Sequence, residues 1–204
     1  MIAIRSEGIY SSAHQPVVSF PRLLPTVLLV GGLIGLGASL VLTVERFNLY
    51  ADPDYVPSID SVLSCGSVME PPYAALFGIV GFTVVTTTGA ALAAGARLST
   101  WFWAGLQTGV SFGAALVHGL IYLSLYRIGA LCPYWMVVWA VTITVFWYVT
   151  LRSLDRTRED APAGPVLGLL LRYHSVPIVV WLIGVAVLVI ARFWPYWSSL
   201  PRNG

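Results

Sequence analysis

The sequence predicts an all-α integral membrane protein, and three observations support this fold class. Hydrophobic residues make up 57% of the 204 residues and charged residues only 10%, whereas soluble domains average roughly a quarter charged residues. The mean hydropathy is +0.81. Several apolar runs are long enough to cross ~30 Å of hydrocarbon as helices. We therefore expect membrane helices to account for most of the chain, and we expect no soluble catalytic domain.

Five apolar segments are predicted to cross the membrane. They are Leu23–Thr43, Tyr73–Ala96, Trp101–Tyr126, Cys132–Leu151 and Val176–Trp194. The first is not expected to be a signal peptide, because its apolar run is longer than the usual ~7–15 residues and no small-residue cleavage site follows. The remaining segments are an N-terminal tail (residues 1–22), an outer loop (48–72) and a charged connector (153–172). The fifth helix and the short tail after it together make up the segment 173–204.

The distribution of arginine predicts the orientation of these helices. All eleven basic side chains are arginines, and the net charge is only +2, without a basic run that would suit nucleic acid. With a cytoplasmic N-terminus, seven arginines are inside and four are outside, and the loop 48–72 contains none, which agrees with the positive-inside rule. The inner set is Arg5, Arg22, Arg97, Arg152, Arg156, Arg158 and Arg172, and the outer set is Arg46, Arg127, Arg192 and Arg202.

The chain has two cysteines, and this topology places both on the extracytoplasmic side of a cell membrane. Cys65 lies in the outer loop, within "SIDSVLSCGSVMEPP", and Cys132 lies where the fourth predicted helix begins. The outside is oxidising, so a disulfide between them would persist. Their bonding is sterically plausible if their Cα atoms come within about 7 Å. No metal-ligand set stands out in the sequence.

Cys132 begins the sequence "CPYW", which is typical of a helix N-terminus. Pro133 suits the first helical turn, because its missing N–H has no partner there anyway. Cys132 is then expected at or near the N-cap, where the positive end of the helix dipole favours the thiolate. A thiolate at this position attacks disulfides readily and is also a good leaving group. The alternative reading is a small buried residue at a helix start; for Cys65 it is a structural half-cystine that pins the loop.

Two cysteine-centred motifs, "LSCGSVM" and "YRIGALCPYWMVVW", together with "ALFGIVGFTVVTTTGAALAAG", resemble the bacterial branch of the vitamin K epoxide reductase family. The resemblance covers roughly Pro25 to Arg152. It implies a four-helix bundle around a quinone of the menaquinone or ubiquinone type, capped by the outer loop, with the fifth helix as an addition. It also implies that electrons pass from a separate thioredoxin-like dithiol protein through loop cysteines to a C-x-x-C pair, which reduces the quinone. No thioredoxin-like domain is expected after the fifth helix.

The chain departs from this family pattern in three places. Cys65 matches the second loop cysteine and Cys132 the first cysteine of C-x-x-C, but the loop's other cysteine is absent and Trp135 stands where the second cysteine would be. An insertion with "PN" after "FG" is also missing. The four-cysteine relay of the family therefore cannot operate, although two cysteines suffice to carry two electrons. A Cys65–Cys132 disulfide would tie the outer loop to the bundle.

Four further residues are candidates for the quinone site. Trp135 and Trp139 share a face of the fourth predicted helix and could form an aromatic wall; the alternative is an interfacial aromatic belt. Phe77 is assigned to the site by the resemblance. His118, an ionisable group inside the third predicted helix, could donate a proton to a quinone, although a histidine bonded between helices is the more common case.

Gln107 and the run Thr86–Thr88 are expected to form hydrogen bonds across helices. For function, the first hypothesis is a membrane thiol–disulfide oxidoreductase that reduces quinone. The second is a redox-inactive family member with a permanent disulfide that serves as a scaffold or binding protein. A chain engineered to trap one disulfide is a third alternative, which the shortened loop disfavours.

Overall fold

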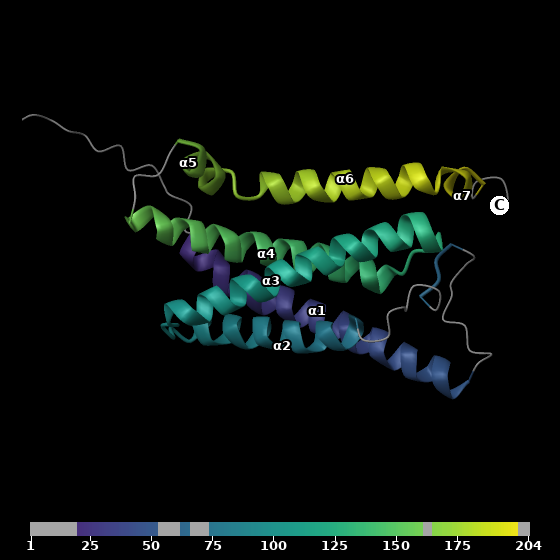
Figure 1. Cartoon of the computed structure of the whole chain (residues 1–204), viewed down its shortest axis with the longest axis horizontal. Helices are drawn as coiled ribbons and strands as arrows, with labels where there is room; N and C mark the ends of the chain where they lie inside the picture. Colours follow the sequence, from purple (N-terminus) through teal and green to yellow (C-terminus); the bar gives the residue numbers. More distant parts are fainter. Residues whose placement is uncertain (1–19, 53–61, 66–73, 161–164, 200–204) are drawn as a thin grey trace, which may run out of the picture.

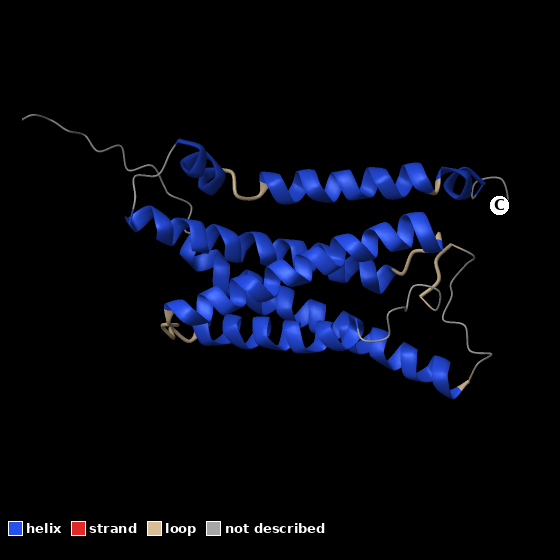
Figure 2. Ribbon diagram, in the orientation of Figure 1, coloured by secondary structure: helices blue, strands red, loops and turns tan. Residues whose placement is uncertain are grey.

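The computed structural model describes residues 20–52, 62–65, 74–160 and 165–199, and it confirms an all-α membrane architecture (Figure 1). The helices are α1 (Phe20–Ala51), α2 (Ala74–Ala93), α3 (Thr100–Tyr122), the π-helix η2 (Leu123–Ile128), α4 (Pro133–Asp160), α5 (Pro165–Arg172), α6 (Val176–Arg192) and α7 (Trp194–Ser199). Figure 2 shows that the loops among the described residues join the helices near the ends of the bundle.

Among the described residues, four helices are long and apolar enough to cross a membrane: α1, α2, α3 continued by η2, and α4. Helix α6 is apolar but shorter, with 17 residues, or about 25 Å of helix. It runs along the outside of the other four and contacts α4 (Figure 1). The structure thus contains the expected four-helix bundle and an additional apolar helix beside it.

Several helix ends differ from the predicted ones. Helix α1 continues to Ala51, so its last turn occupies the start of the segment expected to be the outer loop, 48–72. Helix α4 continues to Asp160, and α5 also lies in the segment expected to be a connector, 153–172. The physical reason is that apolar runs mark only the part of a helix inside hydrocarbon. Helix α1, at 32 residues and about 48 Å, extends beyond it.

Close packing of α1 on α2 depends on glycine. Helix α1 packs against α2 and α4, and α4 packs against α3. A Cβ atom added at Gly89 of α2 would collide with the backbone of Leu28 and Leu29 in α1, and one added at Gly32 would collide with Thr86. Glycine therefore lets the two helix backbones approach, as is usual inside membranes.

Polar side chains inside the bundle are bonded mostly within their own helix. Gln107 of α3 does bond across, since its Nε2 donates to Thr150 Oγ1 of α4 at 3.0 Å, as expected. The expectation for Thr86, Thr87 and Thr88 was wrong: their hydroxyls donate to carbonyls three or four residues earlier in α2. Such back-bonding satisfies a hydroxyl locally, so no partner helix is needed.

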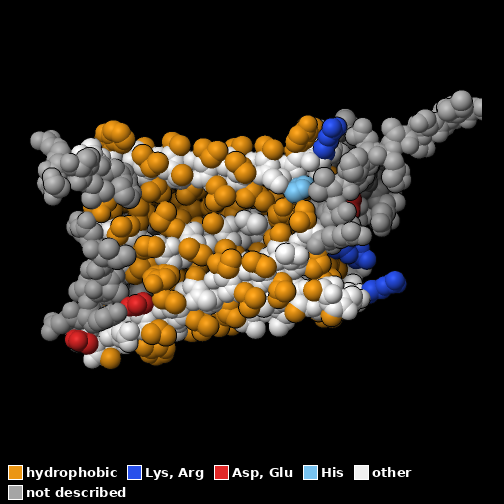
Figure 3. Space-filling model, turned by 180° about the vertical axis from the view of Figure 1, so that it is seen from behind, with side chains coloured by type: hydrophobic (Ala, Val, Ile, Leu, Met, Phe, Trp, Pro, Cys, Tyr) orange, Lys and Arg blue, Asp and Glu red, His pale blue; other side chains and the backbone are white. Residues whose placement is uncertain are grey.

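The two ends of the bundle carry different groups. Residues 62–65 and the start of α4 lie at one end, and the start of α1 lies at the other (Figure 1). The arginine side chains visible in Figure 3 gather at the end near the start of α1, while apolar side chains cover the middle of the molecule. The buried core is divided accordingly into one cluster around the cysteines and a second one around Leu28, Leu106 and Val149.

Candidate functional site: the Cys65–Cys132 disulfide and two buried tryptophans

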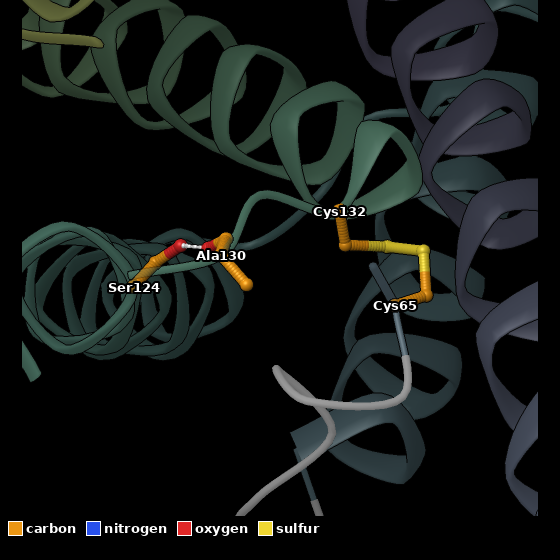
Figure 4. Close-up of a disulfide and its surroundings, with 4 residues drawn as sticks. All are labelled: Cys65, Ser124, Ala130 and Cys132. Carbon is orange, nitrogen blue, oxygen red and sulfur yellow. Dashed lines mark hydrogen bonds between the residues drawn. A yellow bond between two sulfur atoms is a disulfide. The ribbon is translucent and has the colours of Figure 1, made fainter. Parts of the chain in front are cut away.

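The two cysteines are joined by a disulfide, which confirms the expected pairing (Figure 4). Their Cα atoms lie 4.5 Å apart, although 67 positions separate them in the sequence. The bond links the segment 62–65 directly to the residue before α4. Cys132 is completely buried, and Cys65 is 6% exposed. The bond is therefore covered by the protein, and its Cys65 side is nearer to the surface.

A short backbone contact aligns the two cysteine segments. The N–H of Leu131 donates to the carbonyl of Val62 at 2.8 Å, and Leu63 forms an isolated parallel β-bridge with Leu131. This pairing holds the residues before Cys65 alongside the residue before Cys132. The loop is thus fixed to the bundle by a hydrogen bond as well as by the disulfide.

Cys132 has the N-cap position predicted from "CPYW". Helix α4 begins at Pro133, and the N–H of Met136 donates to the carbonyl of Cys132 at 3.1 Å, which is the first hydrogen bond of the helix. The Cys132 sulfur is therefore attached at the positive end of α4, where backbone N–H groups lack partners.

The turn before Cys132 is fixed by Ser124. Gly129 ends η2 with a φ of 72°, a left-handed conformation that suits glycine. The N–H of Gly129 donates to the carbonyl of Ser124 at 2.9 Å, and the fully buried Ser124 hydroxyl donates to the carbonyl of Ala130 (Figure 4). Two hydrogen bonds from one residue thus close the turn that leads to Cys132.

Trp135 and Trp139 belong to the same buried cluster as the disulfide. They are 5% and 2% exposed, which rules out the alternative that they are interfacial belt residues. The indole Nε1 atoms of both are buried and have no hydrogen-bond acceptor in the described part of the chain. A buried donor without a partner costs about 1–3 kcal/mol. Both donors lie on one face of α4, and a ligand that presents oxygen acceptors would satisfy them.

The structure does not bring Phe77 or His118 into this cluster. Phe77 is 59% exposed on α2 and lies edge to face with Phe112 of α3, with 6.4 Å between ring centroids. His118 lies between α3 and α6: its Nδ1 is 2.8 Å from the carbonyl of Ala114, and its Nε2 accepts a hydrogen bond from Trp181. Their assignment to a quinone site stays a prediction.

An apolar depression lies between α1 and α4. It has a volume of about 150 Å³, is lined by residues of α1 and α4, and includes Ala140, the residue after Trp139. Neither Trp135 nor Trp139 lines the depression.

The fold and this site define a class: a helical membrane protein with a disulfide between the segment that joins α1 to α2 and the N-terminus of α4. The model of the vitamin K epoxide reductase family matches residues 26–150, which is more than half of the chain and includes both cysteines. The chain belongs to this family, whose members are membrane thiol–disulfide oxidoreductases. No curated protein and no solved structure matches the chain. Helices α5, α6 and α7 lie outside the matched residues.

Proposed function

We propose that this protein is a two-cysteine oxidoreductase that transfers two electrons from a separate thioredoxin-like dithiol protein to a membrane quinone. The observation that carries the proposal is the disulfide at the N-cap of α4, about one helical turn from the indole N–H of Trp135 and about two turns from that of Trp139. Both N–H groups are buried and have no acceptor among the described residues. Family membership supports thiol–disulfide chemistry. The quinone and the dithiol partner are the proposed substrates.

In the first half of the reaction, a partner thiolate attacks the sulfur of Cys65. Cys65 is the more exposed half of the bond, and Cys132 is the better leaving group because the dipole of α4 stabilises its thiolate. The second thiol of the partner then attacks the mixed disulfide and releases Cys65. The partner leaves oxidised, and the two electrons remain on Cys65 and Cys132 as a dithiol.

In the second half, the disulfide forms again and the two electrons and two protons pass to the quinone, which supplies the electron-accepting chemistry. Trp135 and Trp139 would donate hydrogen bonds to the quinone carbonyls, since an indole N–H is a donor only. Neither indole can supply a proton, so the protons come from the thiols and from water. Because Trp135 replaces the second cysteine of the family motif, Cys132 itself has to face the quinone.

The test is thiol-dependent quinone reduction by the purified protein in lipid nanodiscs, with a reduced thioredoxin-like protein as donor and a short-chain ubiquinone or menaquinone as acceptor. We expect one quinone reduced per dithiol oxidised, and complete loss of turnover in Cys65→Ser and in Cys132→Ser. Absence of quinone reduction by the unaltered protein with both quinones would refute the proposal.

A redox-inactive scaffold remains the second candidate, and one observation favours it. The disulfide and both indoles are almost fully buried, as in a bond kept only for stability. In that case, thioredoxin-like proteins would reduce the bond no faster in the native protein than a small thiol does. Rapid reduction by the partner protein and slow reduction by glutathione would support the enzyme.

We also propose that the N-terminus is cytoplasmic and that both cysteines face the outside. The positive-inside distribution of the eleven arginines supports this orientation. The segment 62–65 and the start of α4, which the disulfide joins, lie at the end opposite to the start of α1 (Figure 1). After reduction of intact cells, a membrane-impermeant maleimide should label the cysteines. Labelling that requires permeabilised cells would contradict the orientation.

A further inference from the structure

Helix α6 lies outside the part of the chain that matches the family, yet its C-terminal end contacts η2, which leads into the turn that carries Cys132. Val189 and Phe193, at the end of α6, are 5% and 6% exposed and belong to the buried cluster of the disulfide. We propose that α6 braces this turn and that Arg192 is a positioning residue for Cys132. The bracing contacts are present in the structure independently of the reaction. Their effect on turnover rests on the proposed function.

The first contact joins Arg192 to η2. Arg192 Nε donates to the carbonyl of Leu125 at 3.0 Å, across 67 positions of sequence. Leu125 is 1% exposed and lies in the last turn before Gly129. In the last turn of a helix, backbone carbonyls have no N–H partner within the helix. A cationic donor is favourable at this C-terminal end of a helix, because the carbonyls there carry partial negative charge.

From Leu125 the connection to Cys132 is short. The neighbouring residue is Ser124, whose hydroxyl and carbonyl bond to Ala130 and Gly129 and close the turn. Ala130 precedes Cys132 by two residues, and Figure 4 shows Ser124, Ala130 and the disulfide in sequence along this turn. Arg192 therefore holds η2 at the residue next to the one that fixes the cysteine-bearing segment.

The second contact lies earlier in α6, at Trp181. Trp181 Nε1 donates to His118 Nε2 at 3.1 Å, and the two rings are edge to face with centroids 5.7 Å apart. Since a carbonyl only accepts and an indole N–H only donates, His118 Nδ1 donates to the carbonyl of Ala114 and Nε2 accepts from Trp181. Trp181 and Arg192 thus fasten α6 to α3 and to η2, its continuation.

The brace matters for the equilibrium between the disulfide and the two thiols. The disulfide forms only when the turn is in one conformation. In the dithiol the turn can adopt further conformations unless another contact restricts it, and this gain in conformational entropy favours the dithiol. A brace that restricts the reduced turn raises the effective concentration of the Cys132 thiol at Cys65. Loss of one hydrogen bond of ordinary net strength should lower the equilibrium constant for disulfide formation about three- to tenfold.

The experiment measures this equilibrium without any quinone. The full chain in nanodiscs is equilibrated with glutathione buffers of different ratio, and the fraction of Cys65–Cys132 disulfide is read by alkylation and mass spectrometry. The variants are Arg192→Gln, Arg192→Lys and Trp181→Phe. The matched control is Trp147→Phe, which removes a hydrogen bond of 2.7 Å from Trp147 Nε1 to the carbonyl of His174 at the opposite end of α6.

We expect Arg192→Gln and Trp181→Phe to favour the dithiol about three- to tenfold, Arg192→Lys to restore most of the equilibrium constant, and Trp147→Phe to stay within about twofold of the native value. The inference is overturned if Arg192→Gln stays within twofold, or if the control shifts the equilibrium as much as Arg192→Gln does. Should Arg192→Gln fail to fold, Trp181→Phe decides by the same criteria. Failure of quinone reduction would not affect this result.

Discussion

Replacement of Trp139 by phenylalanine tests whether the buried indole N–H serves a ligand or only fills space. Trp139 is 2% exposed, and its Nε1 has no acceptor within the described residues. The replacement removes two buried ring carbons, at a cost of about 1–3 kcal/mol by comparison with other buried carbon deletions. It also removes an unsatisfied donor, which raises the free energy of unfolding by about 1–3 kcal/mol. The two terms nearly cancel, so the free energy of unfolding should change by less than about 1.5 kcal/mol.

Quinone affinity should respond differently to the same replacement. Loss of a hydrogen bond to a quinone carbonyl weakens binding by about 0.5–1.5 kcal/mol, or about two- to tenfold in KM for quinone. Trp147→Phe is the control, because its N–H is already satisfied by His174. That replacement should lower the free energy of unfolding by about 2 kcal/mol, from lost packing and a lost hydrogen bond, and leave KM unchanged.

The two quantities are measured separately. Reversible unfolding in mixed detergent and sodium dodecyl sulfate micelles gives the free energy, and quinone titration under saturating dithiol gives KM. The reasoning is refuted if Trp139→Phe destabilises the protein by more than about 3 kcal/mol, since the donor would then have had a partner. It is also refuted if KM for quinone does not change.

Two further predictions concern stability alone. Gly89→Ala should destabilise the α1–α2 contact by about 1–3 kcal/mol, because the new Cβ meets the backbone of Leu29, whereas Gly81→Ala on the same helix meets nothing within 4 Å and should be neutral or slightly stabilising in the same unfolding assay. Equal effects of the two would contradict the packing. Cys65→Ser opens a loop of 67 residues and should lower the free energy of unfolding by up to about 4 kcal/mol, measured against the oxidised protein; no change would mean that the bond does not constrain the unfolded chain.

The sequence predicts the bundle well because hydrocarbon imposes one strong rule, that an apolar run of sufficient length crosses it as a helix. The same rule says nothing of water-exposed turns, which is why the ends of α1 at Ala51 and of α4 at Asp160 were missed. The N-cap position of Cys132 was predictable because Pro133 marks a first helical turn.

Other parts of the site could not be predicted from local patterns. The π-helical turn and the hydrogen bond from Ser124 to Ala130 have no sequence signature, apart from Gly129 as a helix terminator. The contact of Arg192 with Leu125 joins residues 67 positions apart and depends on how α6 packs. The missing acceptors of the two indoles became evident only from burial in three dimensions. Such features depend on tertiary packing, which hydropathy does not encode.

The most direct test of the central claim is a single-turnover experiment on the two cysteines. The protein is reduced, freed of reductant and mixed with excess quinone without oxygen, and the Cys65–Cys132 disulfide and reduced quinone are quantified over time. The account predicts that the disulfide returns and that one quinone is reduced for each disulfide formed. Thiols that stay reduced in the presence of quinone, or a disulfide that returns without quinone reduction, would contradict it.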